Sequence, residues 1–298
     1  MVTRIILVLV VLTGVASAQA PQITIGIYAP SVSFDTAQAR LAYVQGLAKA
    51  IEQNTGIPTK GDAYASMAAL KKANPDYAIV EAQCYATNAG WQLLANAKID
   101  GGTTRTWALY SSAGDNMQAL KGKKLAYMAT GCNDDGFIDN AMLESEVDKS
   151  FWGGKAGETG GITAAVAAVS SYKTAQAVFA PTSAAKGLTK VFDTGSVANP
   201  AFVEVNSKMS AETTNKVASA VVGYGGSGAI QGWARGARDV YQALAGRMQP
   251  VRKTGVFAPA EAARLDAKDV LIDPPTLREA AFVAVRHHFV RAPNARLE

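Results

Sequence analysis

Two hydrophobic periods alternate along the chain, and their order predicts the class of fold. Short apolar runs typical of buried strands occur at Ile23–Tyr28, Tyr77–Val80, 107–110, 125–128 and 178–180. Stretches with helical spacing follow at 64–72, 85–95 and 138–147, and earlier at positions 41, 44, 47 and 51. This strand–helix order predicts an α/β fold with a mostly parallel sheet, in which ligands bind at the carboxyl ends of the strands.

Boundary signals divide these elements. Asp35 or Thr36 is the expected N-cap of the first helix and Gly56 its expected C′ residue. The glycine-rich stretch 153–161 is predicted to be a surface loop. A strand at 201–206 is followed by a helix-start signal at Ser210.

The start of the chain has the pattern of a secretory signal peptide. A basic residue precedes the apolar run 5–12, and two overlapping A-x-A triplets end at positions 18 and 20. We therefore interpret residues 1–18 as the signal peptide and expect the mature chain to begin near Gln19 or Pro21. The apolar run is short for a membrane anchor, so we expect a soluble protein exported to the periplasm.

Composition limits the functional classes. The 298-residue chain has a net charge of +5, without a block of lysines and arginines, so nucleic acid and anionic lipid are not expected partners. Its length exceeds that of a usual single core, which predicts one large domain or two lobes. Two cysteines are too few to hold such a chain together, so burial of apolar surface must do so.

Four segments carry a family resemblance. They are ITIGIYAPSVSFDTAQARL and its continuation at 23–57, a helix, strand and Cys-Tyr loop at 63–90, LKGKKLAYMATGCNDDGF and its continuation at 120–143, and LTKVFDTGSVANPAFVEV at 188–205. Their order and spacing resemble the phosphate/phosphonate-type solute-binding proteins, the type 2 periplasmic receptors of ABC importers. The likeness covers roughly residues 22–245.

This resemblance implies a two-lobed α/β fold, the type 2 periplasmic binding protein fold, with a hinge of two crossing strands. It implies lobe one at 21–107 plus 207–298 and lobe two at 108–206, with 107–110 and 201–206 as the hinge strands. It also implies a protein without catalysis or cofactor that delivers a small-molecule ligand to an ABC-type permease in the inner membrane. We expect it to be a monomer.

The candidate ligand-binding residues lie at predicted strand ends or in loops that the resemblance places at the solute. They are Tyr28, Ser31, Ser33, Phe34, Tyr64, Cys84, Tyr85, Thr130, Cys132, Asn133, Asp134 and Tyr172.

The loop at 130–136 departs from the family pattern. The family typically has Ser-Thr-Ser-Gly there, whose hydroxyl and N–H groups bind an anion at a helix N-terminus. This chain has C-N-D-D-G instead, and two carboxylates oppose a phosphate dianion. Asp135 is a candidate cap of the next helix. Asp134 is then expected to accept a hydrogen bond from the ligand, with Asn133 and the loop N–H groups as donors.

The sequence leaves the ligand class open. The resemblance implies a small phosphate- or phosphonate-like oxyanion, whereas an aromatic-lined cleft with few charges would suit a bulky hydroxylated lipid or sterol. An exported enzyme is a third reading, against which the lack of nucleophile–base or metal-ligand spacing counts. The G-x-G-x-x-G match at 223–228 follows a predicted helix and is interpreted as a connection. His287 and His288 lie in a predicted C-terminal helix, where adjacent residues do not face one another.

The two cysteines follow predicted strands in different lobes. An oxidising compartment favours pairing of Cys84 with Cys132, yet a bridge would lock the lobes together. A soft-metal site that includes Met128 is a further reading. Because bridging requires Cα atoms within about 7 Å, we expect two separate thiols.

Overall fold

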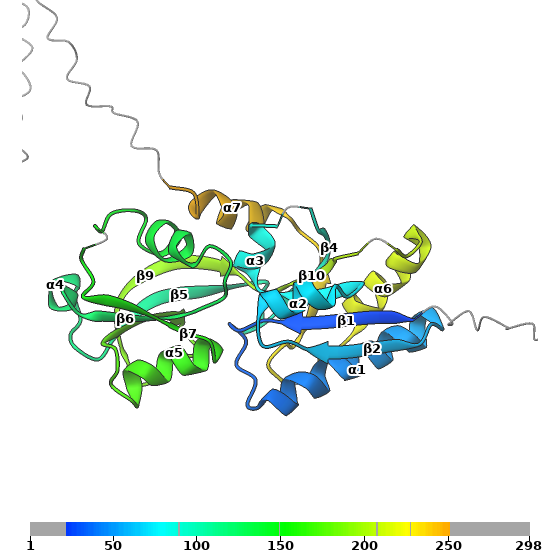
Figure 1. Cartoon of the computed structure of the whole chain (residues 1–298), viewed down its shortest axis with the longest axis horizontal. Helices are drawn as coiled ribbons and strands as arrows, with labels where there is room; N and C mark the ends of the chain where they lie inside the picture. The colour runs from blue at the N-terminus through cyan, green and yellow to red at the C-terminus, as the bar shows by residue number, and fades with distance from the viewer. Residues whose placement is uncertain (1–21, 89, 149, 207, 227, 251–298) are drawn as a thin grey trace, which may run out of the picture. The chain divides into compact units, whose positions relative to one another are not determined.

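The computed structural model describes residues 22–250 except 89, 149, 207 and 227, and it contains two β-sheets (Figure 1). The first sheet has the order β11 (Gly232–Arg235), β4 (Gln92–Lys98), β10 (Ala201–Glu204), β3 (Tyr77–Val80), β1 (Ile23–Tyr28) and β2 (Thr59–Ala63). The second has the order β7 (Gly154–Glu158), β6 (Lys124–Met128), β8 (Ala177–Pro181), β5 (Thr104–Ser111) and β9 (Thr189–Ala198).

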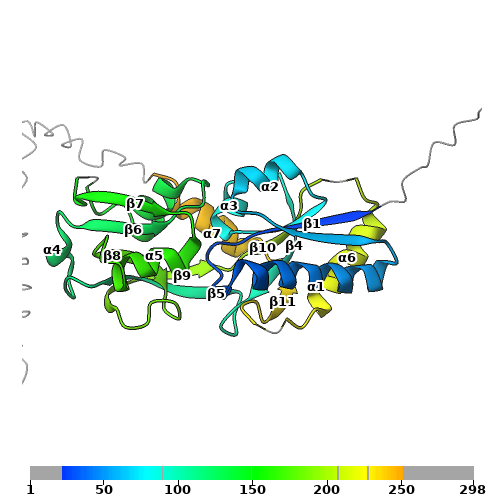
Figure 2. The ribbon, with the colours of Figure 1, turned by 60° about the horizontal axis from the view of Figure 1, so that its bottom comes forward.

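Helices flank each sheet and define two lobes (Figures 1 and 2). The first lobe has α1 (Ala37–Thr55), α2 (Met67–Ala73), α3 (Ala82–Ala86) and α6 (Ala211–Gly223). The second lobe has α4 (Met117–Leu120), the π-helix η1 (Gly136–Met142) and α5 (Gly161–Ser170). Helix α7 (Asp239–Arg247) contacts α3 of the first lobe and both β9 and η1 of the second. The α/β class predicted from the strand–helix order is confirmed.

The sheets are mixed, not mostly parallel as predicted. Strand β1 pairs in parallel with β2 and β3, but β10 runs antiparallel to both β3 and β4. In the second sheet β5 runs antiparallel to both β8 and β9. Strands β4, β5, β9 and β10 stand directly before or after the two places where the chain passes from one sheet to the other. The direction in which the chain enters or leaves each sheet there makes these strands antiparallel to their neighbours.

Local signals at helix ends agree with the structure. The Thr36 side chain accepts a hydrogen bond from the N–H of Ala39, and Gly56 ends α1 with a φ of 73°. The Ser210 side chain likewise accepts from the N–H of Thr213 at the start of α6. Such N-caps satisfy N–H groups that have no partner within the helix.

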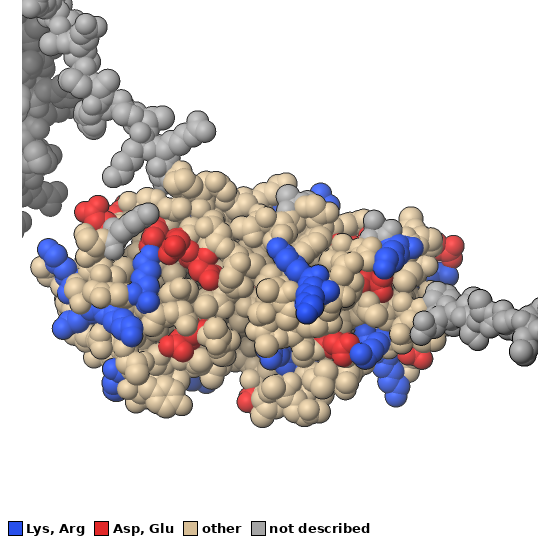
Figure 3. Space-filling model, in the orientation of Figure 1, with Lys and Arg blue, Asp and Glu red and all other residues tan. Residues whose placement is uncertain are grey.

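Buried apolar residues hold each sheet to its helices. Alternate residues of β1, at positions 23, 25 and 27, are fully buried together with Leu47 and Ile51 on the inner face of α1. Burial of one such side chain contributes about 1.5–3 kcal/mol. Within the described residues, no helix has the length and apolar character needed to cross a membrane. Basic and acidic side chains are interspersed on the face drawn in Figure 3.

The chain changes sheets twice, a few residues from the predicted positions. The first change lies at 99–103, between β4 and β5, and the second lies at 199–200, between β9 and β10. The expected hinge strands 107–110 and 201–206 therefore each lie within one sheet. The short turns that connect the sheets carry the crossings instead. The part of the expected first lobe at 251–298 lies outside the described residues.

Arg105 joins both crossings to the first lobe. Its side chain is 8% exposed and donates to Asn199 Oδ1 at 2.7 Å, to the carbonyl oxygen of Ser31 at 3.1 Å and to Ser31 Oγ at 2.9 Å. Burial lowers the pKa of this guanidinium, and nearby Glu81 and Asp100 oppose that shift. These bonds hold β5, the first strand of the second lobe, to the loop after β1 in the first lobe.

Three elements differ from those predicted by local pattern. The stretch 85–95, predicted to be one helix, contains the end of α3 and most of β4, which pairs with β10 and β11. Residues 153–161, predicted to be a loop, contain strand β7, which pairs with β6. The helix expected to reach residue 147 ends at 142, because Glu144 and Ser145 adopt φ values of 51° and 58°.

Candidate functional site

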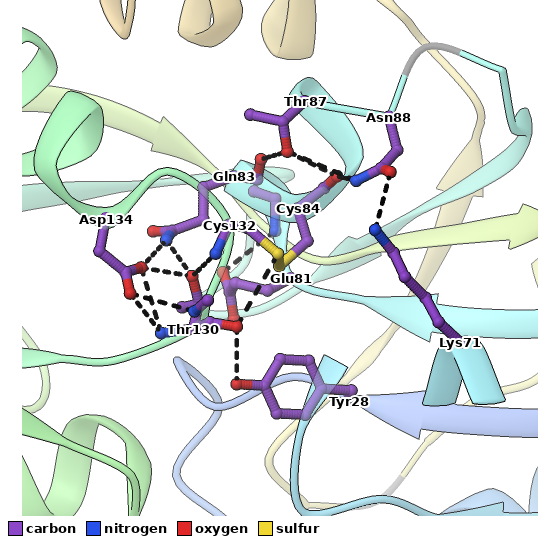
Figure 4. Close-up of a disulfide and its surroundings, with 12 residues drawn as sticks. Tyr28, Lys71, Glu81, Gln83, Cys84, Thr87, Asn88, Thr130, Cys132 and Asp134 are labelled. Carbon is purple, nitrogen blue, oxygen red and sulfur yellow. Dashed lines mark hydrogen bonds between the residues drawn. A yellow bond between two sulfur atoms is a disulfide. The ribbon is translucent and has the colours of Figure 1, made fainter. Parts of the chain in front are cut away.

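Cys84 and Cys132 form a disulfide that joins the two lobes (Figure 4). Cys84 lies in α3, directly after β3, and Cys132 lies in the loop after β6, with a Cα–Cα distance of 5.0 Å. The prediction of two separate thiols is therefore wrong. The prediction assumed that the two Cα atoms are too far apart to be bridged. They lie within bridging distance because the ends of β3 and β6 come close together, which no local pattern in the sequence reveals.

Beside the disulfide, the Asp134 carboxylate is bound by the protein's own donors (Figure 4). The Thr130 N–H donates to both carboxylate oxygens at 3.1 Å, and the Gly131 N–H donates at 3.0 Å. The Thr130 hydroxyl donates at 2.5 Å. Gln83 Nε2 reaches across from the first lobe at 2.6 Å and also contacts the Thr130 hydroxyl.

This arrangement differs from the expected one. From the sequence, the loop N–H groups are expected to donate to the ligand, and Asp134 is expected to accept a hydrogen bond from it. In the structure these groups bond to one another, so the loop contains its own anion. We call Thr130, Gly131, Asp134 and Gln83 the carboxylate knot.

Tyr28, at the end of β1 in the first lobe, reaches the loop of the carboxylate knot. Its hydroxyl donates to the carbonyl oxygen of Thr130 at 3.2 Å. Burial raises the pKa of Tyr28 to about 12, and the negative charges of Glu81 and Asp134 add to the shift, while Arg40 opposes it. Tyr28 is therefore protonated at physiological pH and acts as a donor.

A cavity of about 450 Å³ adjoins Tyr28 and is lined by both lobes; we call it the inter-lobe cavity. The first lobe contributes Tyr28 and Arg40, from the end of β1 and from α1. The second lobe contributes Thr159 and Thr163 at the start of α5, with Tyr172 after its end.

Gly161 lies where the backbones of the lobes touch. The N–H of Ile162 donates to the carbonyl oxygen of Pro30 at 2.9 Å. Gly161 has a φ of 79°, and a Cβ there would lie 2.5 Å from the same carbonyl oxygen. Only glycine fits both the backbone conformation and the close approach.

Arg40 is the cation of the inter-lobe cavity. Its side chain is half-buried, and its Nε is buried without a hydrogen-bond partner. Among the ion pairs that the described part of the chain forms, none includes Arg40. Asp35, also in the lining, is exposed. Among the described residues, no carboxylate therefore forms an ion pair with Arg40 in this cavity.

The other candidate residues are spread over several environments. Ser31 is fully buried, bonded to Arg105 and through its N–H to Glu81 at 3.0 Å. Ser33 and Phe34 line a separate pocket of about 600 Å³ in the first lobe, although Phe34 also borders the inter-lobe cavity.

Tyr64 packs on β1, where its ring lies close to Gly26. Tyr85 is buried edge-on against Tyr241, with ring centroids 4.8 Å apart. Tyr172 is 73% exposed at the cavity rim.

Two loop residues shape the turn that leads into η1. Asn133 has a φ of 58°, and its side-chain oxygen accepts from the N–H of Gly136 at 3.2 Å. Asp135, the candidate cap, makes no side-chain capping bond; its exposed carboxylate lies 3.4 Å from Lys155 Nζ. The capping interpretation is wrong because Asp135 has helical φ and ψ values of −63° and −42° instead of the extended values of an N-cap.

Three polar residues at this site escaped the sequence analysis: Arg40, Glu81 and Gln83. Glu81 and Gln83 follow directly after β3, a position where ligand-site side chains are common, and that signal could have found them. Arg40 lies in the first turn of α1 among exposed residues, and only its place in the lining of the inter-lobe cavity distinguishes it.

Comparison with known proteins supports the architecture. No family model matches the chain, and no curated protein matches it by sequence. Many solved structures are similar in fold at low sequence identity. PhnD1 from Prochlorococcus marinus, in complex with methylphosphonate, has a TM-score of 0.57 and 12% identity, over 75% of this chain and 95% of that one.

A binding protein component of an ABC phosphonate transporter from Pseudomonas aeruginosa has a TM-score of 0.59 and 16% identity, over 90% of this chain and 100% of that one. A Xanthomonas citri protein bound to ATP has a TM-score of 0.59 and 11% identity, over 78% and 98%. The chain therefore has the two-lobed fold of the type 2 periplasmic binding proteins, as its resemblance to them implied.

Proposed function

We propose that this protein is an exported solute-binding protein that holds a small oxyanion between its lobes and delivers it to an ABC-type permease of the inner membrane. The observation that carries the proposal is the inter-lobe cavity. Its volume of about 450 Å³ lies within the usual range of small-molecule sites, and residues of both lobes line it. A cavity shared by two lobes lets a bound solute influence how they associate.

Charge favours an oxyanion over an apolar ligand. Arg40 lines the cavity and its Nε has no hydrogen-bond partner among the described residues, and Thr159 and Thr163 line the cavity from the second lobe. A lipid or sterol would bury that cation without a partner, which is unfavourable. Two of the similar structures are described in terms of phosphonate, one bound to methylphosphonate and one as part of a phosphonate transporter.

Native mass spectrometry tests the proposal. Protein purified from its own periplasm without denaturation is expected to carry a small anionic adduct that is absent after unfolding and refolding in ligand-free buffer. If only the unliganded mass appears and neither methylphosphonate nor phosphate binds in calorimetry, the protein is not an oxyanion receptor.

The same sample tests export. N-terminal sequencing should find the mature chain beginning near Gln19 or Pro21. Recovery of an intact Met1 from the native host would contradict the predicted cleavage.

A further inference from the structure

We propose that Arg40 binds the anionic group of the solute in the inter-lobe cavity, and that Asp134 excludes this group from the loop at 130–136. The inference rests on the proposed function and names the residue that selects its ligand class. It rests on two independent observations, the saturated carboxylate knot and the unpartnered guanidinium.

The knot leaves no room for a second anion. The N–H groups of Thr130 and Gly131, the Thr130 hydroxyl and the Gln83 amide all donate to the single Asp134 carboxylate. A ligand oxyanion placed there would displace these bonds and lie against a fixed negative charge in a partly buried site. Like charges at such distances repel strongly when water is excluded.

Arg40 offers hydrogen-bond donors that no described residue already occupies, unlike the donors of the carboxylate knot. Its Nε is shielded from water and has no acceptor among the described residues. Arg40 and Tyr28 line the same cavity, and the positive charge of Arg40 lowers the pKa of the Tyr28 hydroxyl against the larger effect of burial. A guanidinium offers parallel N–H donors that match two oxygens of a phosphonate, sulfonate or carboxylate. An oxyanion bound in this cavity would give the half-buried guanidinium an acceptor.

The remaining lining suits an organic oxyanion better than a bare inorganic one. Thr159 and Thr163 can each donate a hydroxyl hydrogen bond from the second lobe. The largely exposed ring of Tyr172 and the ring of Phe34 offer apolar surface at the same cavity. A small oxyanion with one organic substituent would use both kinds of surface.

Calorimetry with methylphosphonate on the oxidised protein tests the inference. Arg40→Gln should lower its affinity by about tenfold to a hundredfold, the range for loss of charge-assisted hydrogen bonds. Arg40→Lys keeps the charge without the paired donors and should lose less. Arg235→Gln, which removes an exposed arginine on β11, is the matched control and should bind as the wild type does.

The outcomes separate the two proposals. Wild-type binding that Arg40→Gln leaves unchanged would overturn the role of Arg40 but leave the receptor function standing. Binding that Asp134→Ala abolishes while Arg40→Gln does not would place the anion in the loop and overturn the inference. Absence of binding to the wild type would contradict both proposals. If Arg40→Gln fails to fold, as judged by its unfolding midpoint, the charge-retaining Arg40→Lys decides, and wild-type affinity in that variant would overturn the paired-donor contact.

Discussion

Reduction of the disulfide between Cys84 and Cys132 perturbs the junction of the lobes without changing the sequence. The bond closes a loop with a sequence separation of 48 residues. In the chain-entropy model, opening a loop of this length lowers the free energy of unfolding by about 4 kcal/mol at 25 °C. That is a large share of the 5–15 kcal/mol typical of a folded protein.

Urea unfolding with and without a phosphine reductant measures the effect. With a slope of about 3 kcal/mol per molar, the midpoint should fall by about 1.3 M on reduction. The double variant Cys84→Ser/Cys132→Ser is the control, and its midpoint should not respond to the reductant. Coincident curves for the wild type in both conditions would refute the reasoning, since they would mean that the bond is absent or does not constrain the unfolded chain.

The remaining predictions concern the knot, the lobe contact and a buried hydroxyl. Asp134→Ala frees the loop donors, so affinity for inorganic phosphate should appear or rise in calorimetry; an unchanged isotherm would contradict the account of the knot. Gly161→Ala should lower the free energy of unfolding by about 1–3 kcal/mol because of its φ and its close approach to the first lobe. The control Gly187→Ala has a φ of 80° with open space around it and should cost less; equal losses would argue against the steric part. Because the pKa of Tyr28 is raised to about 12 in the folded protein, its contribution to stability is complete below pH 10 and is lost as the pH rises toward 12. A wild-type unfolding free energy that falls no more than that of Tyr28→Phe over this range would contradict the shift.

Local patterns in the sequence were informative where the structure is itself local. Thr36 and Gly56 bound α1 because a side-chain acceptor and a left-handed glycine act within one helical turn. The apolar run at 23–28 forms β1, paired on both edges, because its side chains are buried on contact with α1 and α2.

The failures arise where distant segments decide the structure. Strand β4 is rich in alanine and leucine, which favour a helix in isolation, yet pairing on both edges holds it as a strand. The pairing of Cys84 with Cys132 depends on the distance between the two lobes. The sequence around either cysteine contains no information on that distance. The role of Asp134 was mispredicted for a local reason. An aspartate four residues after Thr130 can accept hydrogen bonds from the N–H groups of its own loop instead of from a ligand.

The disulfide also changes the covalent connectivity of the two lobes. The closed ring of bonds formed by residues 84–132 contains the first crossing at 99–103 but not the second at 199–200. A protease that cuts once between 85 and 131 would leave both fragments linked through sulfur, so they would separate on a denaturing gel only after reduction. No disulfide among the described residues provides a second covalent connection across the peptide bonds at Asn199 and Pro200. Of the two crossings, only the second is therefore a place where a single cut divides the chain, and Arg105 bonds both to this crossing and to the first lobe.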